Sequence, residues 1–396
     1  MSNSRDYDSK SLRGKRTKLG IRSMKILFIA DSLRIGGIER NALDQLYLLS
    51  DLGNPGVVVL LRPESMRHNA NFLQAERDLI QEKQIELKFI EGKGIRRLYA
   101  FIRIIKQEKP NLIIDYSVLG TVLSRITSLF LLSDVSVHCV IQQFPGLSAP
   151  RQRFKRFLYS QFAHKLFINS VNYSLDWNRL KASSLLGRLL FSKKTNIIRN
   201  GVYLPRLNVV DNFPPRSPVS SPRFVYLGRL KDWKGINNLE VIDRALNSQC
   251  EFYVVAPDVQ EEIVRNLKSI FGRRVSFSFG KSLSAYMPDA RDIHIYPVDY
   301  GTSIPFVESV STNCLEMALL GVPSLVTSGG TRNWPELVEA KVIHEVDWSD
   351  LESIRNGVRN CLTLSVDKSK FRTAVSAIDV QNNLELHLAF RNLGNL

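Results

Sequence analysis

The chain has 396 residues, of which 44% are apolar, so it can bury two sizeable cores and we expect about two domains. The four cysteines are widely spaced and the six histidines are scattered, which argues against a disulfide framework and a structural zinc site and favours a reducing compartment. No apolar stretch reaches the roughly 18 residues that a membrane span needs, and the run Met24–Ala30 is too short for a secretion signal. We therefore expect a soluble, cytoplasmic protein that needs no metal.

A net charge of +16 is the strongest compositional bias, and part of it lies at the start of the chain. Residues 1–25 hold eight Lys or Arg against two Asp, so we expect residues 1–23 to be a disordered basic arm, with Met24 as an alternative working start. No zinc-finger, basic-zipper or RNA-binding aromatic motif accompanies the charge. Phosphorylated substrates or anionic lipid therefore fit the charge better than nucleic acid does.

Strand-like and helix-like segments alternate over residues 24–203, as in a parallel sheet covered by helices. The strands are short, continuous apolar runs, which is typical of strands buried on both faces. The expected strands are 25–30, 57–61, 86–90, 112–116, 135–142 and 165–169. One helix is expected to begin near Gly37, and three more are expected at 95–107, 121–132 and 151–163. We assign residues 24–203 to an N-terminal Rossmann-like domain.

This alternation stops at residues 204–223, which include five prolines and read as a linker or irregular segment. It restarts with expected strands at 224–227, 251–255, 275–279, 293–297 and 324–327, and with helices at 236–246 and 260–271. We expect a second domain over residues 224–376 and a terminal helix over residues 377–396 that packs back toward the N-terminal domain. The predicted fold is therefore α/β, with two doubly wound parallel-sheet domains that face a central cleft.

The most informative motif is a pair of glutamates, Glu308 and Glu316, where a loop rich in Ser, Thr and Pro runs into an apolar helix. Eight residues of helix rise about 12 Å, roughly the length of a nucleotide diphosphate-sugar, and the amides of a helix start attract an anion. One carboxylate could then meet sugar hydroxyls and the other ribose hydroxyls. Alternatively, the spacing of Asn313 and Glu316 matches a capping box, in which Glu316 only satisfies backbone amides.

Cations and glycines follow two other expected strands. Arg229 and Lys234 lie where strand 224–227 ends, which is the edge of a parallel sheet where such folds bind ligands. Arg offers a planar fork to phosphate oxygens and Lys a mobile charge, although solvated surface cations are the alternative. Gly36 and Gly37 join the first strand to the first helix and could offer amides to a diphosphate, or form an ordinary tight turn.

In their order and spacing, these motifs resemble a large bacterial family of retaining glycosyltransferases, family 4, which includes mannosyl-, glucosyl- and N-acetylglucosaminyltransferases. The resemblance spans roughly residues 24–340. It rests on Asp31–Arg40, Asn200-Gly201-Val202, Gly228-Arg229-Leu230, Lys234-Gly235, Gly280, Glu308, Glu316, Ala318 and Gly321-Val322-Pro323. It implies the GT-B architecture and transfer of a sugar from a nucleotide diphosphate-sugar, with no metal or other cofactor.

The resemblance also implies roles for single residues. Arg229 and Lys234 would grip the donor diphosphate, and Glu308 would hold the transferred sugar. The remaining donor-binding residues would be Gly36, Gly37, Gly280, Lys281, Ser309, Ser311, Thr312 and Glu316, of which Glu316 would bind the ribose. The loop Ser309–Thr312 departs from the family, whose members usually carry glycines there, so donor contacts in this loop would differ.

On the acceptor side, many relatives carry a histidine at the end of the strand that corresponds to 135–142. Here Gln142 or Gln143 takes that place, and His138 lies within the strand, where a buried core residue is the simplest interpretation. A glutamine can bond a sugar hydroxyl or phosphate but cannot change its charge near neutral pH. This departure leaves open a non-catalytic sugar-nucleotide- or partner-binding descendant. A nucleotide-sugar epimerase is a further alternative, although the sequence offers no pair of residues to shuttle its proton.

Two basic amphipathic segments, 93–106 and 151–167, carry cations beside aromatic and aliphatic residues and could lie on an anionic membrane. For the first, a sheet-covering helix with a solvated face is the alternative. The sequence thus predicts a glycosyltransferase of cell-surface polysaccharide biosynthesis that uses a glycan or lipid-linked acceptor. We expect it in the cytoplasm or peripherally on the inner face of the cytoplasmic membrane.

Overall fold

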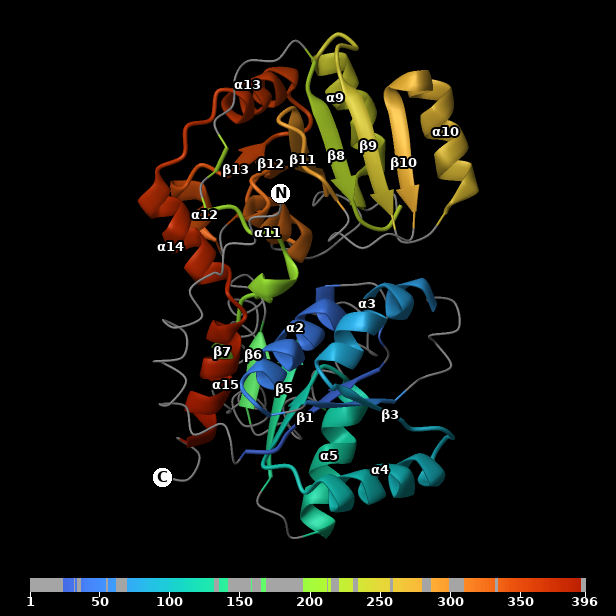
Figure 1. Cartoon of the computed structure of the whole chain (residues 1–396). Helices are drawn as coiled ribbons and strands as arrows, with labels where there is room; N and C mark the ends of the chain where they lie inside the picture. Colours follow the sequence, from blue (N-terminus) through green and yellow to red (C-terminus); the bar gives the residue numbers. More distant parts are fainter. Residues whose placement is uncertain are drawn as a thin grey trace, which may run out of the picture.

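The computed structural model shows two α/β domains, joined where the chain passes between them (Figure 1). It describes residues 24–31, 33, 37–54, 56–61, 70–131, 135–141, 158, 165–168, 195–211, 213–214, 221–230, 234–256, 259–279, 286–298, 310–331 and 334–392. Each domain is built on one parallel sheet, so the predicted fold class is confirmed.

The N-terminal domain holds a seven-stranded parallel sheet in the order β3-β2-β1-β4-β5-β6-β7. Its strands are β1 (Ile26–Ala30), β2 (Val57–Leu60), β3 (Glu86–Phe89), β4 (Leu112–Asp115), β5 (Ser136–Ile141), β6 (Lys165–Ile168) and β7 (Thr195–Ile197). Helices α2 (Gly37–Asp51) and α3 (Ala70–Glu82) pack on one face, and α4 (Ile95–Glu108) and α5 (Val118–Phe130) on the other. Strand β1 is buried along its whole length because alternate residues serve the two cores.

The C-terminal domain holds a six-stranded parallel sheet in the order β10-β9-β8-β11-β12-β13. Its strands are β8 (Arg223–Leu227), β9 (Glu251–Ala256), β10 (Val275–Phe279), β11 (Asp292–Tyr296), β12 (Ser324–Thr327) and β13 (Ile343–Val346). Helices α9 (Leu239–Ala245), α10 (Glu261–Phe271) and α13 (Leu351–Leu362) share one core with it, and α11 (Thr312–Leu319), α12 (Pro335–Glu339) and α14 (Lys368–Ile378) the other.

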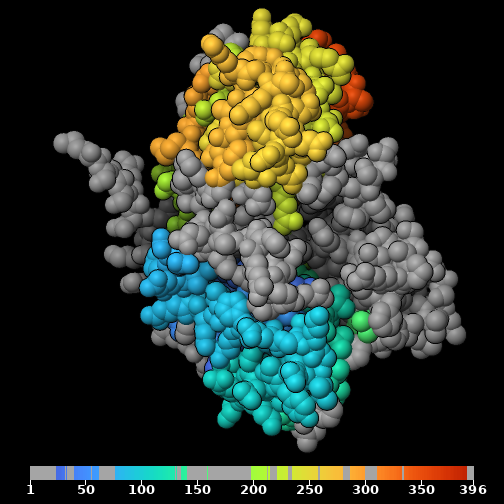
Figure 2. All heavy atoms as spheres, turned by 90° about the vertical axis from the view of Figure 1, so that its right-hand side faces the viewer, coloured from blue at the N-terminus to red at the C-terminus, as the bar shows by residue number. Residues whose placement is uncertain are grey.

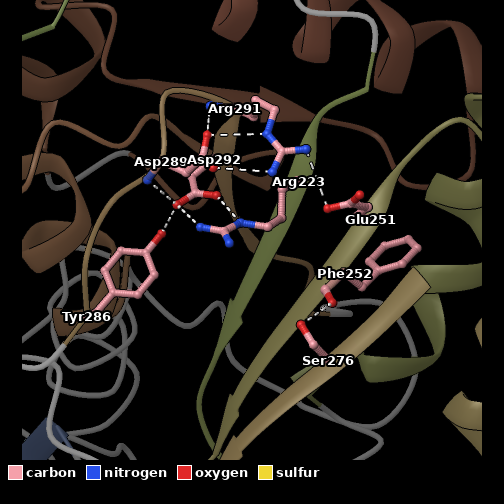
Figure 3. A network of polar contacts seen from close by, with 8 residues as sticks. All are labelled: Arg223, Glu251, Phe252, Ser276, Tyr286, Asp289, Arg291 and Asp292. Carbon is pink, nitrogen blue, oxygen red and sulfur yellow. Dashed lines mark hydrogen bonds and ion pairs between the residues drawn. The ribbon is translucent and has the colours of Figure 1, made fainter. Parts of the chain in front are cut away.

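A network of ion pairs and hydrogen bonds lies at the amino-terminal ends of strands β8 and β11 (Figure 3). The buried carboxylate of Asp292, at the start of β11, accepts hydrogen bonds from Arg223 Nε at 2.5 Å and Arg223 Nη2 at 2.9 Å. The hydroxyl of Tyr286 and the amide of Asp289, the latter at 2.8 Å, also donate to it. Because this edge lies opposite the carboxyl ends of the strands, we assign the network a structural role.

The two domains meet at a place where the chain crosses twice. Val202, in the first crossing, donates its amide to the carbonyl of Ile378 at 2.9 Å, and the amide of Val380 donates back to Val202 at 3.1 Å. The crossing segments come so close at Gly201 that an added Cβ would lie 2.5 Å from the Cα of Val380. The glycine of the Asn200-Gly201 pair is therefore explained by this approach and not by a local turn alone.

The last described element is helix α15 (Gln381–Asn392), which packs on α2 of the first domain. Val380, Leu384 and Leu388 belong to the core that β1 and α2 form. The predicted single terminal helix begins too early, because α14 ends at Ile378 and the chain bends before α15. Asp379 stabilises the new start by accepting a hydrogen bond from the amide of Gln381 at 2.9 Å.

Candidate functional site

The strand order places a topological switch point between β8 and β11. From β8 the chain builds outward through β9 and β10, and β11 then returns to the other side of β8. In open parallel sheets, ligands bind beyond the carboxyl ends of the strands at this position, because neighbouring loops turn in opposite directions there. The arrowheads of β8, β9 and β10 point toward the N-terminal domain (Figure 1), so the carboxyl edge of the sheet faces that domain.

Gly228 and Arg229 follow β8 at this switch point. The side-chain amide of Asn313 donates to the carbonyl of Leu227 at 3.0 Å, and a Cβ added at Gly228 would lie 3.8 Å from the same amide nitrogen. The start of α11 is thereby fixed beside the Gly228-Arg229 turn. Arg229 is exposed, and its carbonyl accepts a hydrogen bond from the hydroxyl of Tyr226 at 2.9 Å.

Lys234 lies at the end of the neighbouring strand β11. Its ammonium donates to the hydroxyl of Tyr296 at 2.9 Å and lies 5.1 Å from the centre of that ring. Gly235 has a φ of 74°, and a Cβ on it would meet the carbonyl oxygen of Pro297 at 1.7 Å. The glycine after Lys234 is therefore required by close packing on the end of β11, which holds the lysine at the switch point.

The first turn of α11 presents hydrogen-bond donors at the carboxyl edge of the second sheet. The backbone amides of Ser311, Thr312 and Asn313 donate no hydrogen bond within the part of the chain that the structure describes. The hydroxyl of Thr312 is buried and also has no hydrogen-bond partner among these residues. Such a helix start suits an anion because the donors converge and the helix dipole adds partial positive charge.

The capping-box interpretation of the Asn313 and Glu316 spacing is wrong. Ser311 is the residue before the helix, and Asn313 lies inside it with its side chain directed to Leu227. Glu316 is buried and forms an ion pair with Arg206 of the short helix η3 (Leu204–Arg206), so it does not reach back to the helix start.

Several predicted site residues lie outside the described part of the chain. They are Glu308, Ser309, Gly36, Gly280, Lys281, Gln142 and Gln143. Gly37 is the first residue of α2. Among the described candidates, the structure brings together Arg229 and the start of α11 with Ser311 and Thr312, and it places Lys234 at the adjacent strand.

The N-terminal sheet has its own switch point, between β1 and β4, where sequence reasoning named the segment Asp31–Arg40 but missed Asp115 and Ser117. The hydroxyl of Ser117 donates to Asp31 at 2.5 Å, and the Ser117 amide donates to Asp115 at 2.6 Å. Burial raises the pKa of Asp115 well above its usual range, although the Ser117 amide opposes this. Asp31 directly follows β1 and Asp115 is the last residue of β4, so a polar residue where an apolar strand ends is the signal that could have identified this pair.

His138 is buried, as the sequence analysis expects, and its Nδ1 lies 3.2 Å from Nδ1 of His387 on α15. Its Nε2 contacts the hydroxyl of Ser136 at 3.1 Å. The described residues contain no group of three or more His, Cys, Asp or Glu side chains placed to hold a metal ion. No helix in this part of the chain is long and apolar enough to cross a membrane.

Comparison with known proteins agrees with this geometry at the level of the fold. No protein-family model matches the sequence, and no curated protein matches it either. Among solved structures, the Anabaena protein HepE in complex with UDP-glucose has a TM-score of 0.63 and 17% identity, over 94% of this chain and 100% of HepE.

Two further solved structures also match this chain over most of the length of both proteins. A glycosyltransferase from Rickettsia africae has a TM-score of 0.64 and 12% identity, over 92% of this chain and 97% of its own. Sucrose-phosphate synthase from Thermosynechococcus elongatus has a TM-score of 0.62 and 15% identity, over 94% and 99%. At these identities the likeness shows the fold, and the protein has the two-domain GT-B fold.

Proposed function

We propose that the protein is a retaining glycosyltransferase that moves a sugar from a nucleotide diphosphate-sugar to a glycan or lipid-linked acceptor. The observation that carries the proposal is the start of α11, where the amides of Ser311, Thr312 and Asn313 donate no hydrogen bond to any described residue, and which lies beside the Gly228-Arg229 turn at the switch point of the second sheet. A diphosphate could accept hydrogen bonds from these amides and from the cations Arg229 and Lys234, and its negative charge matches theirs. HepE, which shares the fold, has been crystallised with UDP-glucose and with UDP.

The chemistry follows from where charge develops. The acceptor hydroxyl oxygen bonds to the anomeric carbon as the bond from that carbon to the diphosphate breaks, and the bonding electrons stay on the leaving phosphate oxygen. That oxygen takes the proton of the acceptor hydroxyl, so no protein base is needed. Arg229, Lys234 and the amides of α11 would stabilise the negative charge as it forms, and Glu308 would hold the sugar.

Binding and turnover together test this proposal. Titration calorimetry with UDP- and GDP-sugars should find at least one that binds, and slow hydrolysis of that donor without an acceptor should follow. Glu308→Ala and Lys234→Ala should each lower turnover by about 10²-fold or more, while Lys268→Ala, a lysine on α10 that lies over Phe277, should leave turnover unchanged. The absence of any binding, or near-normal turnover in both site variants, would refute the proposal.

We also propose that the enzyme works in polysaccharide biosynthesis at the inner face of an anionic cytoplasmic membrane, which it contacts through the outer face of α4. Phe101 and Ile105 of this helix are buried against the sheet, whereas Ile95 and Tyr99 are 67% and 66% exposed. Successive residues turn by about 100° around a helix, which places the exposed cations Arg96, Arg103 and Lys106 on the same outer side as Ile95 and Tyr99.

This arrangement fits a bilayer with anionic headgroups, because apolar groups enter the interface while cations meet phosphates. In Figure 2 the segment coloured cyan to teal, which includes α4, forms part of the near surface of the first domain. Vesicles with phosphatidylglycerol should sediment the protein in a salt-sensitive way, and phosphatidylcholine vesicles should not. Equal sedimentation of an Ile95→Ser/Tyr99→Ser variant would remove α4 as the contact. The other candidate, 151–167, lies almost wholly outside the described residues.

A further inference from the structure

A buried arginine joins two carboxylates that belong to different domains. Arg206 lies in η3, in the first crossing between the domains. Its Nε and Nη2 donate to Asp44 of α2 at 2.9 and 3.2 Å, and Nη2 also donates to Glu316 of α11. We call Asp44, Arg206 and Glu316 the interdomain triad. It links α2 of the first domain with α11, whose first turn is the candidate anion site.

All three members of the interdomain triad are shielded from water. The exposed fractions of the side chains are 0% for Asp44, 7% for Arg206 and 5% for Glu316. Burial alone would lower the pKa of Arg206, but the charges of Asp44 and Glu316 more than offset this and raise it. Arg206 thus stays charged. Burial raises the pKa of Asp44, and the charges of Arg206 and Arg40 oppose that rise. Asp44 already binds the guanidinium at two points, so the bond to Glu316 is an additional contact, made from the other domain.

The bond to Arg206 uses only one of the two carboxylate oxygens of Glu316. Only its Oε1 meets Arg206, and its Oε2 accepts no hydrogen bond within the described part of the chain. Glu316 follows Thr312 by four residues, a rise of about 6 Å along the helix. A carboxylate one turn beyond a diphosphate site is at a suitable distance to accept bonds from ribose hydroxyls.

We propose that Arg206 is a positioning residue that fixes Glu316 for the ribose of the donor and, through Asp44, ties that orientation to the placement of the N-terminal domain. The inference rests on the proposed function, because it assigns a nucleoside diphosphate to the α11 site. Arg206 itself touches no donor atom. It restricts the Glu316 side chain to one rotamer, so this side chain loses its conformational entropy before the donor binds and not upon binding.

A merely structural link between the domains would affect stability but not the recognition of one hydroxyl group. The decisive measurement is therefore the ratio of the dissociation constants for 2′-deoxyUDP and UDP, obtained by titration calorimetry and repeated with GDP and ADP pairs. In the unmodified protein, a bond from the 2′-hydroxyl to the Glu316 carboxylate should make this ratio roughly 10 to 100. Glu316→Gln should lower the ratio toward 1.

Arg206→Met should lower the ratio to below about 3, because the Glu316 side chain is then no longer held. Arg206→Lys, which keeps the charge but loses the fork, should give an intermediate ratio. Asp44→Asn serves if Arg206→Met does not fold, and it should also lower the ratio. The matched control is Arg199→Met, since Arg199 belongs to the same crossing but binds Glu336 of the second domain at 2.8 and 2.9 Å. This control should retain the full ratio.

The outcomes separate the inference from the function on which it rests. If no nucleoside diphosphate binds the unmodified protein, the proposed function fails. If UDP, GDP or ADP binds with a ratio near 10 or above and Arg206→Met keeps that ratio, the function stands and the positioning role is refuted. A ratio that rises in Arg206→Met would mean that Arg206 competes with ribose for Glu316, which also overturns the inference.

Discussion

The substitution Gly201→Ala tests how closely the two crossings between the domains approach. The added methyl carbon would lie 2.5 Å from the Cα of Val380 and 3.1 Å from its Cβ. Ordinary contact needs about 3.5 Å or more, so one crossing must move by about 1 Å. The backbone bonds between Val202 and its partners Ile378 and Val380, at 2.9 and 3.1 Å, would be lost or lengthened.

The cost follows from these contacts. Two backbone hydrogen bonds contribute about 1 kcal/mol each, and overpacking against a backbone atom costs about 1–3 kcal/mol. We therefore expect Gly201→Ala to lower the free energy of unfolding by about 3–5 kcal/mol, measured by urea denaturation with circular dichroism.

The matched control is Gly53→Ala, where an added Cβ meets nothing within 4 Å but the φ of 77° is unfavourable for alanine. Its expected cost is about 1 kcal/mol from backbone strain alone. A Gly201→Ala loss no larger than that of Gly53→Ala would refute the argument from close approach.

Three further predictions concern the site, the response to pH and the sheet edge. Gly235→Ala should lower donor affinity at least tenfold in calorimetry, because a Cβ 1.7 Å from the carbonyl oxygen of Pro297 must displace the preceding lysine. Burial lowers the pKa of His387 from 6.5 to about 3, so its contribution to folding stability should be full above pH 6.5 and fall by about 3 kcal/mol by pH 4, measured by denaturant unfolding across that range; His294, whose pKa burial also lowers to about 3, should add a similar loss. Asp292→Ala should cost about 3 kcal/mol in the same assay, because it removes the carboxylate that Arg223 binds at two points.

Each of these predictions has a variant that separates it from a general loss of stability. Gly272→Ala, with a φ of 57° and open space around it, should leave donor affinity intact. His387→Gln cannot be protonated, so it should make the loss of stability between pH 6.5 and 4 smaller by the share of His387, and an unchanged loss would contradict the assignment. Arg291→Ala, at the surface of the same sheet-edge network, should cost below about 1 kcal/mol, and a cost equal to that of Asp292→Ala would contradict the role given to burial.

Features that depend on neighbours along the chain were predictable. Strands β1 to β6 and β8 to β12 were predicted within one or two residues, because most of them are continuous apolar runs, as is typical of strands buried on both faces. The Lys234-Gly235 pair was recognised from its place after β8, and the structure adds the reason for the glycine, which is the carbonyl of Pro297. Residues 328–376, which form α12, β13, α13 and most of α14, received no assignment from the sequence.

Features that depend on distant partners were not predictable. Arg206 lies in a proline-rich stretch that reads as an irregular linker, and its buried position depends on carboxylates from two different helices. Gly201 suggests a local turn until Val380 is seen to pass beside it. The bend at Asp379 interrupts what the apolar spacing alone predicts as one helix, because the segment pairs with Val202.

The position of α15 affects the order in which the protein can fold during synthesis. Because Val380, Leu384 and Leu388 complete the core around β1 and α2, the first domain lacks part of its interior until residues 380–388 have left the ribosome. The strands and most of the helices of the second domain lie between the two crossings. The residues of its cores are therefore almost all synthesised before α15. Nascent chains that stall before residue 380 should therefore expose apolar surface on the half that was made first.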